Sequence, residues 1–316
     1  MATTTSITTT YAGEFANKYI AAALLSGKTL NDQAISLRTN IKYQEKIKKL
    51  AVSDIIKNAT CDFTDTGSVT LTERVLSPEE FQINIELCKK DFRSDWESQS
   101  MGISVHDNLP KSFADYFVAY VAAGVAQKTE QNIWGGVNSN AGEFDGFTVL
   151  MAADSDVVDA ANGSQTAFTS SNIQTLFGNV LSDVPSAVYG AEDLTLYVPT
   201  VAYQQYIRSL NGFGASGLGA AGINAQGSMW YNNGNALSFE GVKVQLAPGM
   251  PADHIVAAQA SNLYFGTGLL QDHVEVKVID MADIDGSQNV RIVMRFTAGV
   301  QYGIGSEVVL LTLAAA

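Results

Sequence analysis

Histidine and cysteine, the side chains that most often hold metals or act as nucleophiles, are scarce in this chain. It has three histidines and two cysteines among 316 residues. His106, His254 and His273 lie in separate segments, and none has a Cys, His or carboxylate at metal-ligand spacing. Cys61 and Cys88 cannot build a disulfide framework and are expected to be free thiols. We therefore expect no metal, no cofactor and no catalytic centre, and predict that the protein is not an enzyme.

Charged residues are also few, at 16% of the chain, whereas 46% of the residues are apolar. In a typical soluble protein about a quarter of the residues are charged. The lower fraction here predicts that much of the surface is buried against copies of the same chain. The formal net charge of −13 argues against a protein whose main task is to bind nucleic acid, because phosphates require a basic surface.

Long hydrophobic runs and a secretory signal are absent as well. The most apolar short run, residues 19–25, is far below the roughly 20 residues that a membrane helix needs. The N-terminus is rich in threonine and lacks the charged-then-apolar order of a signal peptide. We expect a soluble protein that is made in a cytoplasm and does not contact membranes.

Two strings match ligand-binding motifs only in part. Residues 212–217 fit G-x-G-x-x-G, but a dinucleotide fingerprint needs a strand before it and a helix after it. We interpret them as a flexible loop, and a nucleotide-binding α/β enzyme remains an alternative that rests on this string alone. Asp283 and Asp285 suggest a cation, yet the closing glutamate of an EF-hand loop is missing, so a hairpin turn is favoured.

The most informative positive feature is a helical pattern over residues 112–134. Apolar side chains recur at intervals of three and four and form one stripe. Ser112 and Asp115 form a capping pair at its start, and Gly135-Gly136 ends it. Such a helix is roughly 35 Å long at 1.5 Å per residue. We expect its stripe to pack under a hairpin formed near the C-terminus.

Two regions alternate with a period of two and predict strands. Residues 60–87 predict an extended two-stranded β arm, which needs a supporting surface because a lone hairpin is marginally stable. Residues 273–280 and 289–296 predict a second hairpin, joined by a turn at 283–286. Its charged face either pairs Glu275 with an arginine within the chain or meets another subunit.

Between these regions the pattern predicts an α/β lobe with helices at 169–188 and 200–210. One strand is expected at 194–198, and three more, at 242–246, 255–258 and 263–265, follow a long loop at 211–235. A basic cluster precedes the β arm. It is interpreted as a solvated helix face, with a contact to acidic neighbours or nucleic acid as the alternative; its members are Lys42, Lys46, Lys48 and Lys49.

The order of these parts resembles the major capsid protein of tailed bacteriophages, which has the Hong Kong 97-type fold. The stretches that carry the resemblance are 131–136, 144–146, 197–203, 239–244, 249–251 and 261–266. The resemblance implies an α+β fold with an N-terminal arm, an extended β loop, a long spine helix, and peripheral and axial lobes. The implied divisions are the arm at 1–50, the β loop at 51–92, the peripheral domain at 93–137 and 271–299, and the axial domain at 138–270 and 300–316.

The same resemblance implies a function and partners. The chain would assemble with itself into hexamers, pentamers and an icosahedral shell around double-stranded DNA, touching the DNA only nonspecifically. Portal proteins, and scaffolding or decoration proteins, are further implied partners, and the implied location is the virion, assembled in the host bacterial cytoplasm. An encapsulin-like compartment shell is the alternative. The candidate assembly contacts are Phe63, Thr66, Glu73, Arg74, Glu275, Lys277, Arg291 and Arg295.

Overall fold

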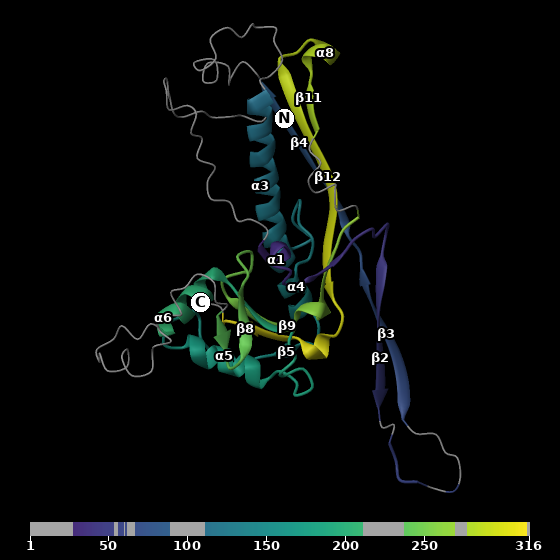
Figure 1. Ribbon diagram of the computed structural model, residues 1–316, viewed down its shortest axis with the longest axis vertical. Coiled ribbons are helices and arrows are strands. Elements are labelled where there is room, and N and C mark those ends of the chain that lie inside the picture. Colours follow the sequence, from purple (N-terminus) through teal and green to yellow (C-terminus); the bar gives the residue numbers. More distant parts are fainter. Residues whose placement is uncertain are drawn as a thin grey trace, which may run out of the picture.

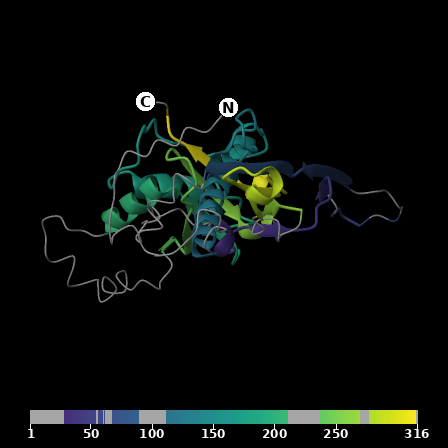
Figure 2. The ribbon, with the colours of Figure 1, turned by 90° about the horizontal axis from the view of Figure 1, so that it is seen from above.

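The structure is a computed structural model, and it describes residues 28–53, 56–59, 61, 67–88, 111–210, 237–268 and 277–314. Three parts are visible: a long β ribbon beside one helix, a compact α/β lobe below them, and a β hairpin that projects from the body (Figure 1). Seen from above, the helices of the lobe and the hairpin lie on opposite sides of the long helix (Figure 2). The molecule is therefore elongated and has one protruding arm.

The ribbon is organised around the strand β12 (Asn289–Tyr302). Along one edge it pairs over ten residues with β4 (Glu79–Cys88) in antiparallel register. Its other edge pairs first with β11 (Lys277–Asp280) and then with β10 (Leu263–Gly266), whose far edge carries β1 (Ser36–Arg38) in parallel. The turn between β11 and β12 is the short helix α8 (Ala282–Asp285), closed by Gly286 in the left-handed conformation.

The predicted long helix is present as α3 (Lys111–Gly135), which runs beside the ribbon (Figure 1). Val121 and Val125 of the predicted stripe face β4, and alternate residues of β4 face the helix in turn. Alternation along β4 thus places apolar side chains toward α3 and polar ones outward, as the burial pattern of the strand shows.

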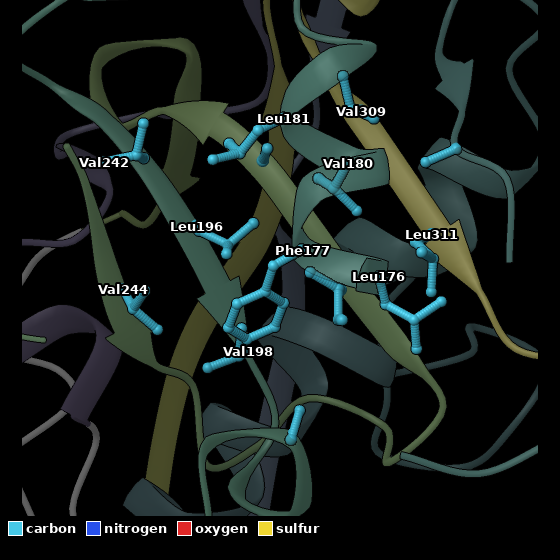
Figure 3. Close-up of a cluster of buried hydrophobic side chains, with 14 of the residues drawn as sticks. Leu176, Phe177, Val180, Leu181, Leu196, Val198, Val242, Val244, Val309 and Leu311 are labelled. Carbon is cyan, nitrogen blue, oxygen red and sulfur yellow. The ribbon is translucent and has the colours of Figure 1, made fainter. Parts of the chain in front are cut away.

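The lobe is a six-stranded sheet in the order β5-β13-β9-β6-β8-β7. Its strands are β5 (Val158–Asp159), β13 (Val309–Thr312), β9 (His254–Gln259), β6 (Leu194–Val198), β8 (Val242–Leu246) and β7 (Ser238–Phe239). The helices α5 (Ile173–Ser182) and α6 (Thr200–Leu210) pack against it. Fully buried Phe177 lies at the centre of this core, against side chains of β6 and β8 (Figure 3).

Helix α5 is shorter than the predicted 169–188. At its start the Asn172 side chain accepts the backbone N–H of Thr169, so these residues form a turn before the helix begins. At its end Pro185 disfavours helical conformation in the residue that precedes it. The helix α6 and the strands β6, β8, β9 and β10 lie where the sequence predicted them.

A buried junction joins α3 to the lobe. The Trp134 ring lies 5.1 Å from that of Tyr197 and 5.5 Å from that of Phe147, which begins α4 (Phe147–Ala152). A Cβ atom added to Gly146 would lie 2.6 Å from the Asn132 carbonyl oxygen, closer than real Cβ atoms approach. Glycine is therefore required where the chain returns against the end of α3.

The same junction holds the first described residues. Thr29, in the short helix α1 (Lys28–Asn31), donates its backbone N–H and its hydroxyl to the carboxylate of Glu130, and its hydroxyl accepts the Trp134 indole N–H at 2.9 Å. Glu130 is fully buried, and this burial raises its pKa, although the Thr29 hydrogen bonds act in the opposite direction. Tyr197 then binds the Ala34 carbonyl, which ties the segment to the lobe.

The predicted pairing of the two strands within residues 60–87 is wrong. The strands β3 (Ser68–Leu76) and β4 do not pair with each other: Ser77-Pro78 separates them, β4 joins β12, and β3 pairs with β2 (Glu45–Ser53). The hairpin therefore starts at Glu45, within the region expected to be the N-terminal arm. Alternation predicts a strand and its faces but carries no information about the partner strand.

The basic cluster accordingly lies in and beside a strand, and the predicted helix face is wrong. Lys46, Lys48 and Lys49 belong to β2. The only apolar residues between 45 and 50 are Ile47 and Leu50, whose spacing of three mimics a helical pattern. At the other end of the chain, β12 continues to Tyr302, beyond the predicted end at residue 296.

Substituting Gly146 with alanine tests the junction. The backbone at Gly146 (φ −77°, ψ 170°) suits any residue, so the added Cβ acts only through its clash with the end of α3. We expect Gly146→Ala to lower the free energy of unfolding by about 1–3 kcal/mol in denaturant titrations. Gly178→Ala in α5 is the matched control, because its Cβ meets nothing within 4 Å; it should be neutral or stabilising by up to about 1 kcal/mol. Equal effects of the two changes would contradict this account.

Candidate assembly surfaces

The described residues hold no cluster of side chains that could bind a metal ion. Among them, no three His, Cys, Asp or Glu side chains gather as metal ligands. His254 is bound to the neighbouring Asp253 carboxylate at 2.6 Å, while His106, His273 and the glycine-rich string 212–217 lie outside the described residues. None of the helices in the described part of the chain has the length and apolarity to cross a membrane.

The hairpin formed by β2 and β3 exposes several apolar side chains. Leu50 and Leu71 lie opposite each other in the register, and Val69 lies two residues from Leu71 on the same face. These side chains are 64%, 63% and 66% exposed. Apolar residues gathered on a projecting arm indicate a surface that another molecule covers.

The opposite face of the hairpin is attached to the body at its root. The Arg74 guanidinium binds the Asp154 carboxylate and lies 4.5 Å above the ring of Tyr302, whose hydroxyl donates to Asp154 at 2.7 Å. Burial acts to raise the pKa of Asp154, but hydrogen bonds from Tyr302, the Asp156 N–H and Arg74 outweigh it and hold that pKa below its usual value. This cluster fixes the direction in which the hairpin leaves the body.

Further polar contacts continue along the hairpin. Lys46 binds Glu73 across the two strands at 2.7 Å, and this lysine lowers the pKa of Glu73. On the other face Lys49 approaches the Ser306 hydroxyl at 3.5 Å. Glu73 and Arg74, both expected as contacts between subunits, therefore have partners within the chain, and Glu73 is still half-exposed.

The outer face of the ribbon carries the other charged candidates. Arg291 binds the Glu86 carboxylate of β4 at 2.8 Å, and Asn289 donates to the same group at 2.6 Å. Arg295 lies opposite Gln82 and is exposed. The expected pairing of Glu275 with an arginine lies outside the described residues.

Three more predicted positions have no described side chain. Phe63 and Thr66 lie outside the described residues, and Lys277 is placed only by its backbone, opposite Val293. The four candidates whose side chains are described do not form one site. Glu73 and Arg74 lie on the hairpin, and Arg291 and Arg295 lie on the ribbon.

A groove that the sequence did not predict lies between α3 and β4. Its volume is about 460 Å³, and apolar side chains of both elements dominate its lining. The lining includes Phe81, Ile83, Ile85, Val121, Val125, Phe144 and Phe296. Gly124 also lines it, and a Cβ atom added there would meet nothing within 4 Å. A sequence pattern identifies an apolar face but not the gap that remains when two such faces pack.

The Glu143 carboxylate, which the sequence analysis did not predict as a structural group, holds the loop after α3 together. Glu143 accepts hydrogen bonds from Lys128, from the Asn140 side chain and from the backbone N–H of Val137. These bonds, that of Lys128 foremost, lower the pKa of Glu143 to about 2. Asn138 in the same loop donates to Glu79 of β4 at 2.7 Å, so the loop joins the helix end to the ribbon.

Comparison with known proteins identifies the fold. No protein-family model and no curated protein matches the sequence. Solved structures do match: the capsid of a native GTA particle has a TM-score of 0.64 at 11% identity, covering 98% of this chain and 96% of the other. A structure from Mycobacterium phage Adephagia gives 0.61 at 15% identity, covering 97% and 96%, and the capsid of Myoviridae phage XM1 gives 0.58 at 12%, covering 96% and 97%.

These matches extend over nearly the whole of each chain, so the protein has the mixed α and β fold of the subunits in these capsid structures. The predicted capsid-protein fold is confirmed at this level.

The low pKa of Glu143 gives a prediction about acid stability. Its folded pKa of about 2 lies below the usual 4.5, so its contribution to stability is present above pH 4.5 and is lost as the pH falls toward 2. At pH 7, Glu143→Gln should be less stable than the wild type, and this difference should shrink between pH 4.5 and 2 in denaturant unfolding. A difference that does not change with pH would contradict the prediction.

Proposed function

We propose that this protein is a major capsid protein of the Hong Kong 97 type, which assembles into the icosahedral head shell of a tailed bacteriophage. The observation that carries the proposal is the match to capsid structures over at least 96% of this chain. The exposed apolar face of the hairpin supports it, because a shell subunit needs surfaces that only neighbouring copies cover. Hexamers and pentamers of this chain would be the units of the shell.

In this proposal each part of the fold has a role. The helix α3 is the spine helix, the ribbon of β4, β11 and β12 belongs to the peripheral lobe, and the six-stranded sheet is the axial lobe at the centre of hexamers and pentamers. The hairpin of β2 and β3 is the extended loop that reaches over an adjacent subunit. Portal protein, with scaffolding or decoration proteins, completes the particle in the host cytoplasm.

The net charge of −13 is compatible with a protein shell that encloses DNA without binding it tightly, because acidic side chains repel phosphates. The capsid structures that match give no support to an encapsulin-like compartment or to a nucleotide-binding enzyme. The glycine-rich string behind the enzyme alternative lies outside the described residues. A structural role without catalysis is the function that we propose.

The direct test is assembly of the purified chain. We expect sedimentation and negative-stain microscopy to reveal hexamers, pentamers or closed shells, whose formation increases with protein concentration. A strictly monomeric species at high concentration, with or without added scaffolding protein, would overturn the proposal.

The attachment of the hairpin gives a second test. Arg74→Ala removes the charged hydrogen bond to partly buried Asp154, and should lower the free energy of unfolding by about 1–3 kcal/mol. Because the hairpin then loses its fixed direction, we also expect fewer or misshapen shells in electron micrographs. Lys46→Ala is the control on the exposed face of the same hairpin, and its effect on stability should stay within about 0.5 kcal/mol.

A further inference from the structure

Residues 28–38 form a strap that crosses the end of α3 and connects it to both the lobe and the ribbon. The helix α1 lies where α3 meets the lobe (Figure 1). Beyond it, the Tyr197 hydroxyl donates to the Ala34 carbonyl, and β1 then pairs with β10 of the ribbon. Thr29, Ala34 and Ile35 are each no more than 5% exposed, so the strap belongs to the core of this junction.

A carboxylate lies beneath the strap and holds its first turn. Fully buried Glu130 of α3 accepts the backbone N–H of Thr29 at 3.1 Å and also accepts the Thr29 hydroxyl. The same hydroxyl accepts the Trp134 indole N–H at 2.9 Å. Both groups that donate to the carboxylate are uncharged. Hydrogen bonds from neutral donors offset only part of the cost of removing an ionised carboxylate from water.

The charged groups around Glu130 do not compensate for its burial. Burial raises the pKa of Glu130 above the usual 4.5, and the two hydrogen bonds from Thr29 offset part of this shift. On α1, Lys28 is bound to Asp32 at 2.6 Å, and of this pair Asp32 has the larger effect and also raises the pKa of Glu130. On β8, Lys243 acts on Asp32 and helps to keep it ionised.

The remaining elements around the carboxylate add no compensating charge. Gly249, in the loop after β8, packs against the Glu130 carbonyl, and its neighbours in that loop are proline and methionine. Burial raises the pKa of Tyr197, so its hydroxyl stays protonated, while the hydrogen bond from Lys28 lowers the pKa of Asp32. Among the acidic groups Glu130, Asp32 and Tyr197, Glu130 is therefore the one whose charge changes between pH 4.5 and neutral pH.

Protonation of Glu130 preserves its contacts with the strap. With the proton on Oε1, the Oε2 atom still accepts the Thr29 N–H, and the new O–H donates to the Thr29 hydroxyl oxygen. When the strap leaves, the carboxyl group reaches water and its pKa returns toward 4.5. A group whose pKa is higher in the closed state stabilises that state at low pH, and this stabilisation is lost as the pH rises through the closed-state pKa.

We propose that Glu130 is a pH-dependent clasp, whose protonated form holds the strap closed over the end of α3 and whose ionised form lets the strap open by local unfolding. Opening separates Thr29 from Trp134 and exposes the edge of β10 that β1 covers, so ribbon and lobe are then joined by fewer contacts. This device acts within a single subunit, and it goes beyond the shell function without resting on it.

Hydrogen exchange in the full-length protein measures the opening of the strap. The backbone N–H groups of Thr29, Asp32 and Ala34 are bound in the closed strap and exchange when it opens. After correction for the intrinsic exchange rate, we expect the opening equilibrium to rise by up to about tenfold for each pH unit above 4.5. It should become constant at the pH where Glu130 is ionised in the closed state as well.

Two variants assign this pH dependence to one carboxyl group. Glu130→Gln keeps the shape and the hydrogen-bonding groups of the side chain but cannot ionise, so its strap should show the low opening of the acid wild type at every pH. Glu143→Gln is the matched control. Glu143 also contacts α3, through Lys128, but its pKa of about 2 keeps it ionised above pH 4.5, so the strap should retain the wild-type pH dependence.

Tryptophan fluorescence gives an independent measurement. In a Trp96→Phe, Trp230→Phe background, Trp134 is the only tryptophan of the chain. It is fully buried and loses its hydrogen bond to Thr29 when the strap opens. We expect its emission to shift to longer wavelength as the pH rises above 4.5, and expect no such shift when Glu130→Gln is added.

The wild-type profile alone can overturn the inference, even if a variant fails to fold. Strap opening that does not change with pH, or that increases in acid, contradicts it, and so does a Glu130→Gln strap with the wild-type pH dependence. Each of these results leaves the shell function intact, because only failure of the wild-type chain to assemble counts against that proposal.

Discussion

The packing of Trp134 at the end of α3 is the constraint on which the rest of the structure depends. Its ring contacts Tyr197 of the lobe and Phe147 of α4, while its indole N–H binds Thr29 of the first described segment. Segments as far apart as Thr29 and Tyr197 therefore meet at one side chain. A fully buried tryptophan contributes a large apolar area and a directional hydrogen bond, so it fixes both position and orientation. The angle between ribbon and lobe follows from this contact.

The hairpin is attached by a different kind of interaction. The ribbon and lobe share buried apolar cores, whereas the hairpin root combines the buried side chain of Leu76 with polar contacts around Arg74, Asp154 and Tyr302. Apolar packing acts over many atoms and resists deformation, whereas a cluster of hydrogen bonds can be exchanged for others at little net cost. In the shell that we propose, a neighbouring copy would add contacts to the arm.

Sequence patterns predicted the elements better than their partners. The helix at 112–134 and the strand at 194–198 were found because hydrophobic periodicity is a local property. The predicted cap at Ser112 is wrong, because the helix already begins at Lys111. The pairing of β3 with β2, and of β4 with β12, could not be found, because a strand with one apolar face fits any complementary edge. Arg74 and Asp154 are eighty residues apart, and nothing in either neighbourhood indicates their contact.

The distribution of charge bears on the assembly that we propose for this chain. Copies that each carry a net charge of −13 repel one another, which disfavours indiscriminate association. The hairpin strands reverse this sign locally and expose Leu50 and Leu71. Screening shortens the range of the general repulsion to about 8–10 Å at moderate salt, while contacts buried in an interface are screened much less. Short-range complementarity, rather than bulk attraction, then decides which copies associate and in what geometry.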